Sequence, residues 1–379
     1  MMPSTVLRQN VLAAARHIVV KLGTQLLTGS DGKLDLVYFK QIAAQVAALR
    51  QRGVRTTIVS SGAVGAGMAE LGIKNRPSDI ADQQAVASVG QRRLMTHYHE
   101  AFAPHNIPVA QLLLTRGDFD DRARFLNIRN CVARLHELGC IPIINENDTV
   151  AVDELRFGDN DMLAALMTNA LRANALVILS VVDGLLDSAG KRVDLVSDVS
   201  AATGFLRDEK SSLGTGGMNS KLAAATLVVE AGDIAVVAHG REPNVLPRLL
   251  DPATRGLGTV FAPTSRHGKL DSRKRWIGLT KRPGGAVAID DGAVAAVRDR
   301  GKSLLASGIV AVTGEFDEGE VLLVKDAADR EVARGLCNYG ARELRLVMGR
   351  KSTQFAKILG RASYAEVIHR DNLVLTGRP

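Results

Sequence analysis

Two dense clusters of acidic and amide side chains lie close together in the middle of the chain. Asn145–Asp148 directly follows the apolar run Ile141–Ile144. Asp159–Asp161 directly precedes the apolar stretch Met162–Leu171. The run predicts a buried strand and the longer stretch a helix. Carboxylates and amides at such element ends are costly without cationic or hydrogen-bonding partners. A helix cap accounts for one such residue but not for the whole set, so the clusters predict a binding site.

A lysine lies near the end of the first strongly apolar run. Lys21 belongs to His17–Leu22 and is followed closely by Gly23. A lysine at a strand end is commonly a solvated charge whose stem packs on apolar neighbours. The functional alternative is that backbone amides in the glycine turn face a phosphate. The residues alone leave both interpretations open.

Two glycine-rich segments have the composition of anion-binding turns. Ser60–Gly67 follows an apolar run, and its hydroxyls and glycines favour an anion at a helix N-terminus. Its G-x-x-G-x-G spacing differs from the dinucleotide fingerprint, and a plain tight turn is the alternative. Gly214–Lys221 leads into an Ala-rich helix and does not match the Walker A pattern. Lys221 falls in the first turn of that helix, where a cation opposes the macrodipole and is better tolerated beside a bound anion. The alternative is a flexible glycine loop with an incidental lysine.

These candidates include lysines, glycine turns and carboxylates, but no histidine or cysteine nucleophile. A carboxylate substrate is already ionised at neutral pH and needs no general base before it attacks. Phosphoryl transfer to a carboxylate instead needs cations that offset the repulsion between two anions. The set therefore fits transfer of a phosphoryl group to a carboxylate.

The first two-thirds of the chain alternates apolar runs with amphipathic segments. The expected strands are His17–Leu22, Val54–Ser60, Ile107–Leu114, Ile141–Ile144, Ala175–Val182 and Ile234–Ala238. The expected helices are Val37–Arg52, Gln83–Phe102, Arg122–Leu138, Met162–Ala173 and Met218–Ala231. This alternation predicts an α/β fold with a largely parallel, doubly wound sheet covered on both faces. Ligands of such sheets bind beyond the carboxyl ends of the strands, where the polar clusters fall.

The chain changes character after residue 262. Residues 263–275 are polar and without periodicity, which predicts a linker between domains of residues 1–262 and 276–379. We expect the second domain to be compact and β-rich, such as a small barrel, with only one or two short helices. Its expected strands are Ala286–Ile289, Ile309–Thr313, Glu320–Val324, Val332–Leu336 and Ala365–His369.

Positive charge is concentrated in this second domain. From Arg273 onward the chain has 19 Lys and Arg against 13 Asp and Glu, whereas the first 272 residues have 29 against 27. The excess hints at contact with a polyanion, and a solvated basic face is the alternative.

Composition excludes several protein classes. The chain has 379 residues, 46% of them hydrophobic and 23% charged, which is typical of a globular protein of more than one domain. Its three cysteines show no metal-binding or redox spacing and fit a reducing compartment. No apolar run of about 18 residues predicts a membrane span. Arg8 and Arg16 interrupt the N-terminus, which lacks the apolar core of a signal peptide. We therefore expect a cytoplasmic protein with no membrane partner.

The motifs and their order resemble the amino-acid kinase fold, through V-V-K-L-G-T at Val19–Thr24 and V-S-S-G-A-V-G-A-G at Val59–Gly67. Three further motifs narrow the resemblance to the glutamate 5-kinase (γ-glutamyl kinase) family. These are I-N-E-N-D at Ile144–Asp148, G-D-N-D at Gly158–Asp161 and G-T-G-G-M-x-x-K at Gly214–Lys221.

The end of the chain is similar to that family's PUA domain. The segments that carry the similarity are Lys274–Ile277, Ser303–Ile309 and His369–Leu373. Together with the first five motifs, the resemblance extends over nearly the whole chain.

This resemblance implies ATP-dependent phosphorylation of the γ-carboxylate of L-glutamate, the first step of proline biosynthesis. It implies catalytic roles for Lys21, Lys221 and Asp161, with Asp161 positioning both lysines. It implies glutamate binding by Ser61, Gly62, Asp148 and Asn160, with Asp148 meeting the α-ammonium group. It implies ATP binding by Lys21, Gly23, Ser180, Gly214, Thr215, Gly216, Gly217, Met218 and Lys221. The amides of Gly23 and Gly62 are expected to face phosphates. Mg²⁺ is expected to arrive with ATP, with no protein metal site. Proline is implied as a feedback inhibitor, and the chain is expected to form a homo-oligomer.

One segment departs from the family's pattern. After the fifth strand the family usually has Leu-Thr-Asp, two further residues and Gly-Leu-Tyr, whereas this chain has Leu179–Leu186. Ser180 keeps a hydroxyl, but Val181 replaces an acid and Leu186 an aromatic residue. We expect these replacements to affect the affinity for ATP or the selectivity for its base, and not the binding of glutamate.

Two other functions remain as alternatives. The first is an RNA-binding protein that acts through the basic C-terminal domain, although that segment lacks an aromatic stacking stripe. The second is a related kinase for acetylglutamate, aspartate, carbamate or a nucleoside monophosphate, against which the paired acidic motifs and the C-terminal domain argue.

Overall fold

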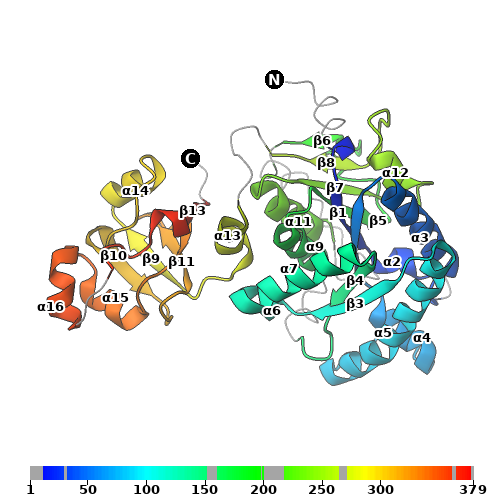
Figure 1. Cartoon of the computed structure of the whole chain (residues 1–379), viewed down its shortest axis with the longest axis horizontal. Helices are drawn as coiled ribbons and strands as arrows, with labels where there is room; N and C mark the ends of the chain where they lie inside the picture. The colour runs from blue at the N-terminus through cyan, green and yellow to red at the C-terminus, as the bar shows by residue number, and fades with distance from the viewer. Residues whose placement is uncertain are drawn as a thin grey trace. The chain divides into compact units, whose positions relative to one another are not determined.

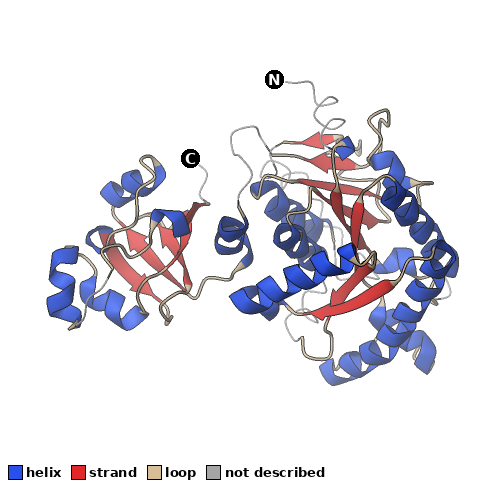
Figure 2. Cartoon of the chain, viewed as in Figure 1, coloured by secondary structure: helices blue, strands red, loops and turns tan. Residues whose placement is uncertain are grey.

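A computed structural model describes residues 12–29, 32–151, 160–197, 199, 217–263, 271–360 and 364–376. The chain divides into two compact units, Met1–Lys269 and Leu270–Pro379. The predicted boundaries at residues 262 and 276 stay a prediction, and the end of the predicted linker forms the short helix α13 (Ser272–Arg275). Figures 1 and 2 show the elements of each unit.

The first unit contains an eight-stranded sheet, in the order β3-β4-β2-β1-β5-β7-β8-β6. Its strands are β1 (His17–Leu22), β2 (Arg55–Ser60), β3 (Val109–Leu114), β4 (Ile141–Glu146), β5 (Ala175–Ser180), β6 (Leu195–Val196), β7 (Ile234–His239) and β8 (Thr259–Phe261). All neighbouring strands pair in parallel except β7 and β8, which pair antiparallel. The predicted largely parallel sheet is therefore confirmed, and its central strands are buried on both faces.

Helices cover both faces of this sheet (Figure 1). Helices α3 (Leu36–Gln51), α5 (Ile80–Phe102) and α12 (Val245–Leu249) share one hydrophobic core with β1, β2, β4, β5 and β7. Helices α7 (Arg122–Glu137), α9 (Asn160–Leu171) and α11 (Met218–Glu230) pack on the other side of the strands. The remaining short helices are α2 (Thr24–Leu27), α4 (Ala63–Leu71) and α6 (Arg116–Asp120). Within the described ranges, no helix combines the length and apolarity needed to cross a membrane.

Helices α4 and α5 lie unusually close to each other because glycines face the contact. A Cβ atom at Gly90 of α5 would lie 1.9 Å from the carbonyl oxygen of Ala63 in α4. A Cβ atom at Gly67 would lie equally close to the carbonyl oxygen of Val86. Any side chain at these positions would push the helices apart. The contact therefore fixes the first turn of α4 against α5.

The second unit contains a five-stranded sheet, in the order β10-β9-β11-β12-β13. Its elements are β9 (Gly285–Ile289), α14 (Asp291–Arg298), β10 (Ile309–Thr313), β11 (Val321–Lys325), β12 (Glu331–Leu336), α15 (Ala341–Val347), α16 (Phe355–Leu359) and β13 (Leu373–Leu375). The β-rich domain is confirmed. Its neighbouring strands pair antiparallel except β9 and β11, and β10 and β13 form the edges.

Two expectations for this unit are wrong. Residues 365–369 do not form a strand, since only Ile368 makes an isolated bridge, to Leu304, and the last strand lies further on at Leu373–Leu375. The adjacent apolar residues Val367 and Ile368 are buried in the core without strand pairing. The unit also has three α-helices after β9 rather than one or two short ones.

Candidate active site

The site residues gather where parallel strands end and helices begin. Lys21 lies near the end of β1, and Ser60 ends β2 directly before the turn into α4. Asn160 and Asp161 begin α9, and Lys221 lies in the first turn of α11. Each helix N-terminus offers unpaired N–H groups and a positive dipole end. The carboxyl edge of the sheet is therefore suited to an anion, as predicted.

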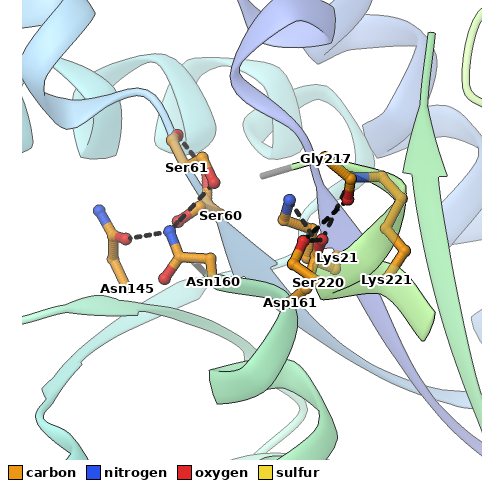
Figure 3. Close-up of polar contacts among 9 residues, drawn as sticks. All are labelled: Lys21, Ser60, Ser61, Asn145, Asn160, Asp161, Gly217, Ser220 and Lys221. Atoms are coloured by element: carbon orange, nitrogen blue, oxygen red, sulfur yellow. Dashed lines mark hydrogen bonds and ion pairs between the residues drawn. The ribbon is translucent and has the colours of Figure 1, made fainter. Parts of the chain in front are cut away.

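A single buried carboxylate holds two lysine ammonium groups (Figure 3). Oδ1 of Asp161 lies 2.6 Å from Nζ of Lys21, and Oδ2 lies 3.2 Å from Nζ of Lys221. The three side chains are buried, with Asp161 fully enclosed. Lys21 and Lys221 are far apart in the sequence, so the fold and not local spacing brings them together. The predicted ion pairs of Asp161 with both lysines are present.

Asp161 is held in its ionised form. Burial alone would raise the pKa of Asp161, but the two ammonium groups outweigh burial and hold the pKa well below its usual range. The hydroxyl of Ser220 donates a further hydrogen bond of 2.9 Å to Oδ2. The three side chains carry two positive charges and one negative charge. This net positive charge leaves the cluster able to attract an anion.

A second cluster of amide and hydroxyl groups lies beside the first (Figure 3). The Nδ2 group of Asn160 lies 3.0 Å from each of three acceptors, namely the Ser60 carbonyl, the Ser61 hydroxyl and Oδ1 of Asn145. Asn160 and Asp161 are neighbours in the sequence, and they serve different clusters. One helix start thus aligns the amide cluster with the lysine pair.

The amide cluster contains a buried acceptor that no described residue satisfies. Oδ1 of Asn160 is buried and accepts no hydrogen bond from the described residues. The side-chain orientation is settled, because the Ser60 carbonyl can accept only from the NH₂ group. A buried acceptor of this kind is costly unless a ligand satisfies it.

Asp148 lies in the turn that follows β4 and is half-buried. Burial raises the pKa of Asp148 to about 6, and Arg76 opposes that rise. A cation bound beside this carboxylate would stabilise its ionised form.

Comparisons with known proteins identify the family. A sequence model of the Amino acid kinase family matches residues 16–238, and one of the PUA domain matches residues 285–359. Glutamate 5-kinase of Methylococcus capsulatus is 44% identical over 97% of this chain and 99% of its own length. Glutamate 5-kinase of Acaryochloris marina is 45% identical over 96% of this chain and its full length.

This chain belongs to the glutamate 5-kinase family.

The resemblance and the predicted fold class are thereby confirmed. A solved structure, carbamate kinase from Giardia lamblia bound to AMP-PNP, aligns with 66% of this chain at 15% identity and a TM-score of 0.47, a value too low to carry an argument.

The glycines that the resemblance assigns to the site differ in their backbone conformation and hydrogen bonding. Gly62 has φ 102° and caps α4, so a residue with a side chain would be strained there. The amide of Gly23 donates to the Leu179 carbonyl at 3.2 Å, and the expectation that it faces a phosphate stays a prediction. Gly217 caps α11, and its carbonyl oxygen lies 3.0 Å from the Ser220 hydroxyl. Met218 begins that helix. Gly214, Thr215 and Gly216 lie outside the described residues, as does Asp159 of the second acidic cluster.

The segment that departs from the family's pattern exposes apolar side chains. Ser180 ends β5 and is half-buried, whereas Val181 is 41% exposed and Leu186 is 47% exposed. Apolar surface at the same end of the sheet as the lysine pair suits contact with a flat base better than with phosphates. The roles of Ser180, Val181 and Leu186 stay predictions.

Sequence reasoning does not single out Ser220, which supports Asp161. It places Asn145 in a predicted binding cluster but does not reveal that this side chain holds Asn160 in place. Both residues lie inside the motifs that suggest the family, but nothing in a motif separates a residue that touches substrate from one that holds a neighbour. The only signal for Ser220 is its position directly before Lys221.

Proposed function

We propose that this chain transfers the γ-phosphoryl group of ATP to the γ-carboxylate of L-glutamate, the first step of proline biosynthesis. The observation that carries the proposal is the buried Asp161 carboxylate that holds Lys21 and Lys221 together beside an amide cluster. Family membership over nearly the whole chain supports the same reaction.

The reaction needs charge neutralisation more than proton transfer. An oxygen of the γ-carboxylate forms a bond to the γ-phosphorus while the bond from that phosphorus to the bridging oxygen breaks. The electron pair of that bond leaves with ADP, and L-glutamyl 5-phosphate forms without a general base. Lys21 and Lys221 offset the repulsion between two anions as they approach and the charge on the transferring oxygens.

The amide cluster and Asp148 suit the amino-acid end of glutamate. The carboxylates of glutamate are acceptors only, so its α-ammonium group is its only hydrogen-bond donor. Among the described residues, none donates to Oδ1 of Asn160, and Arg76 is the cation that influences Asp148. We assign the α-ammonium group to these two acceptors.

Mg²⁺ is proposed to arrive with the nucleotide. Within the described ranges, no group of three or more metal-binding side chains is present, and Asp161 already contacts an ammonium group with each oxygen. The phosphates of ATP and water would therefore hold the ion, and the chain's own residues would act on the phosphoryl group.

Acyl-phosphate formation tests the proposed function directly. Purified protein with ATP, Mg²⁺ and glutamate should yield a product that hydroxylamine traps as the γ-hydroxamate. Aspartate, acetylglutamate and carbamate in place of glutamate should yield much less. No trapped product in the presence of active controls would refute the proposal.

The pKa of Asp148 predicts a pH dependence of glutamate binding. Above about pH 6 the carboxylate is ionised and attracts the α-ammonium group, and below that pH it becomes neutral. The γ-carboxylate of glutamate stays ionised at pH 5, since its ordinary pKa is about 4.3. KM for glutamate should therefore rise about tenfold from pH 7.5 to pH 5. Asp148→Asn should have a high KM at both pH values, and a variant that keeps the wild-type pH profile would contradict the assignment.

The finer partner assignments are also proposals, namely feedback inhibition by proline, homo-oligomer formation, cytoplasmic localisation and contact with RNA. A pocket of about 620 Å³ in the second unit is lined by three cations, Arg300, Lys302 and Arg370, and by two carboxylates, Asp290 and Glu366, so its net positive charge is small and gives contact with a polyanion only weak support. RNA affinity that falls steeply with salt would support this contact, and no binding at low salt would remove it.

A further inference from the structure

Helix α5 contacts the amide cluster through Gln91. Oε1 of Gln91 accepts a hydrogen bond of 2.8 Å from Nδ2 of Asn145. Both side chains are buried, and Gln91 is 9% exposed. Asn145 in turn accepts from Asn160 at 3.0 Å, so a continuous chain of amides joins α5 to α9. These two helices lie on opposite faces of the sheet, and the amide chain crosses its carboxyl edge.

Two backbone groups fix the direction of every bond in this amide chain. The N–H of Glu146 donates to Oδ1 of Asn145 at 2.9 Å, so the Nδ2 group of Asn145 must face Gln91. At the other end, the Ser60 carbonyl forces the NH₂ group of Asn160 toward the sheet edge. Side-chain amides alone could reverse their orientation, but backbone groups cannot. The free carbonyl oxygen of Asn160 is a consequence of this fixed polarity.

Gln91 completes this arrangement at a cost to stability. Its own Nε2 group is buried and has no hydrogen-bond partner among the described residues. An apolar residue would avoid that cost if the position served only the core. With an apolar residue at position 91, however, the buried NH₂ group of Asn145 would lose its acceptor. Asn145 would then gain by rotating away, and Asn160 would lose a neighbour that holds it.

The same helix fixes the adjacent strand end. Tyr98 lies seven positions after Gln91, on the same side of α5, and its hydroxyl donates to Oγ of Ser60 at 2.8 Å. Gly90, directly before Gln91, allows the close contact with the first turn of α4. Three positions of α5 thus contact the site elements: the end of β2, the end of β4 and the start of α4.

We propose that Gln91 is a positioning residue for the amino-acid subsite, acting through Asn145 to present the carbonyl oxygen of Asn160 to the α-ammonium group of the substrate. This assignment rests on the proposed function. Gln91 does not touch the phosphoryl group, so it governs recognition of the amino acid and leaves the transfer step unchanged.

Steady-state kinetics of Gln91→Leu test the assignment. KM for glutamate should rise roughly tenfold, while kcat and KM for ATP stay within about twofold of wild type. Gln91→Glu keeps an oxygen acceptor for Asn145 and should retain most of the wild-type KM. Glutarate, which lacks the α-amino group, should show no such change of KM between wild type and Gln91→Leu.

Gln45 provides a matched control. It is also buried, and its Oε1 accepts a single hydrogen bond, from the amide of Leu246 at 2.9 Å. Gln45→Leu removes a comparable bond in the core on α3, outside the amide chain, and should lower thermal stability without changing KM for glutamate. An equal rise in KM for both leucine variants would overturn the assignment. So would an unchanged KM in folded Gln91→Leu, or an equal rise for glutamate and glutarate.

Calorimetric titration with glutamate separates this inference from the proposed function. Weaker binding by Gln91→Leu than by wild type and Gln45→Leu supports the positioning role, even if no phosphoryl transfer is detected. Transfer by wild type together with equal glutamate affinity in all three proteins would refute the positioning role and leave the proposed function in place.

Discussion

Lys221→Ala should lower kcat by at least about a hundredfold and leave KM for glutamate close to the wild-type value. The ammonium group of Lys221 lies 3.2 Å from Asp161, a longer separation than the 2.6 Å of Lys21. Lys221 lies in the first turn of α11, where the N–H groups of the helix favour an anion, so its ammonium group is placed to meet a phosphoryl group. Its charge is needed most when both bonds to phosphorus are partial, so its removal affects the transfer step.

The variant should stay folded, because Asp161 keeps Lys21 and Ser220 as partners. Lys40, exposed on α3, supplies the matched control, and Lys40→Ala should have wild-type kinetics. Single-turnover phosphoryl transfer from ATP measures the chemical step without product release. If the variant instead had a raised KM and a wild-type kcat, Lys221 would act in substrate binding and not in catalysis.

The sheet follows from sequence because its strands are apolar throughout. All six strands expected in the first unit begin and end within two residues of their observed bounds. A buried parallel strand needs apolar side chains on both faces, whereas a strand with one solvated face alternates apolar and polar residues. The sequence leaves helix α4 open between a helix N-terminus and a plain turn because the helix is short and glycine-rich, and its Gly67 serves the contact with α5.

The site could be predicted only in part, since burial and pairing are tertiary properties. Lys21 could have been a solvated surface charge, and its burial depends on a carboxylate well over a hundred positions later in the chain. Gln91 gives no sequence signal, because a glutamine in a long helix is usually solvated. The hydrogen bond from the Gly23 amide to Leu179 could not be predicted either, since a glycine after a strand does not reveal whether its N–H is paired.

Asp161→Asn should abolish most activity and also destabilise the fold. Asparagine keeps the size of the side chain but removes the carboxylate that forms ion pairs with the buried Lys21 and Lys221. Removal of one partner from a buried ion cluster typically costs about 3–5 kcal/mol. Thermal melting of the unliganded protein should fall by roughly 5–10 °C. Added sulfate or ATP should recover more stability in this variant than in wild type, because an anion can replace the lost charge.

Simultaneous replacement of all three charges separates stability from catalysis. A Lys21→Met, Asp161→Leu, Lys221→Met variant removes the buried charges together, so no ion is left without a partner. Its melting temperature should return to the wild-type value or above it, since well-packed apolar residues can replace a buried ion cluster without loss. Its kcat should remain at background, because no cation is left to meet the phosphoryl group. If the triple variant melted as low as Asp161→Asn, the loss of stability would have to come from packing. If it retained transfer activity, the two lysines could not be the groups that neutralise the migrating phosphate.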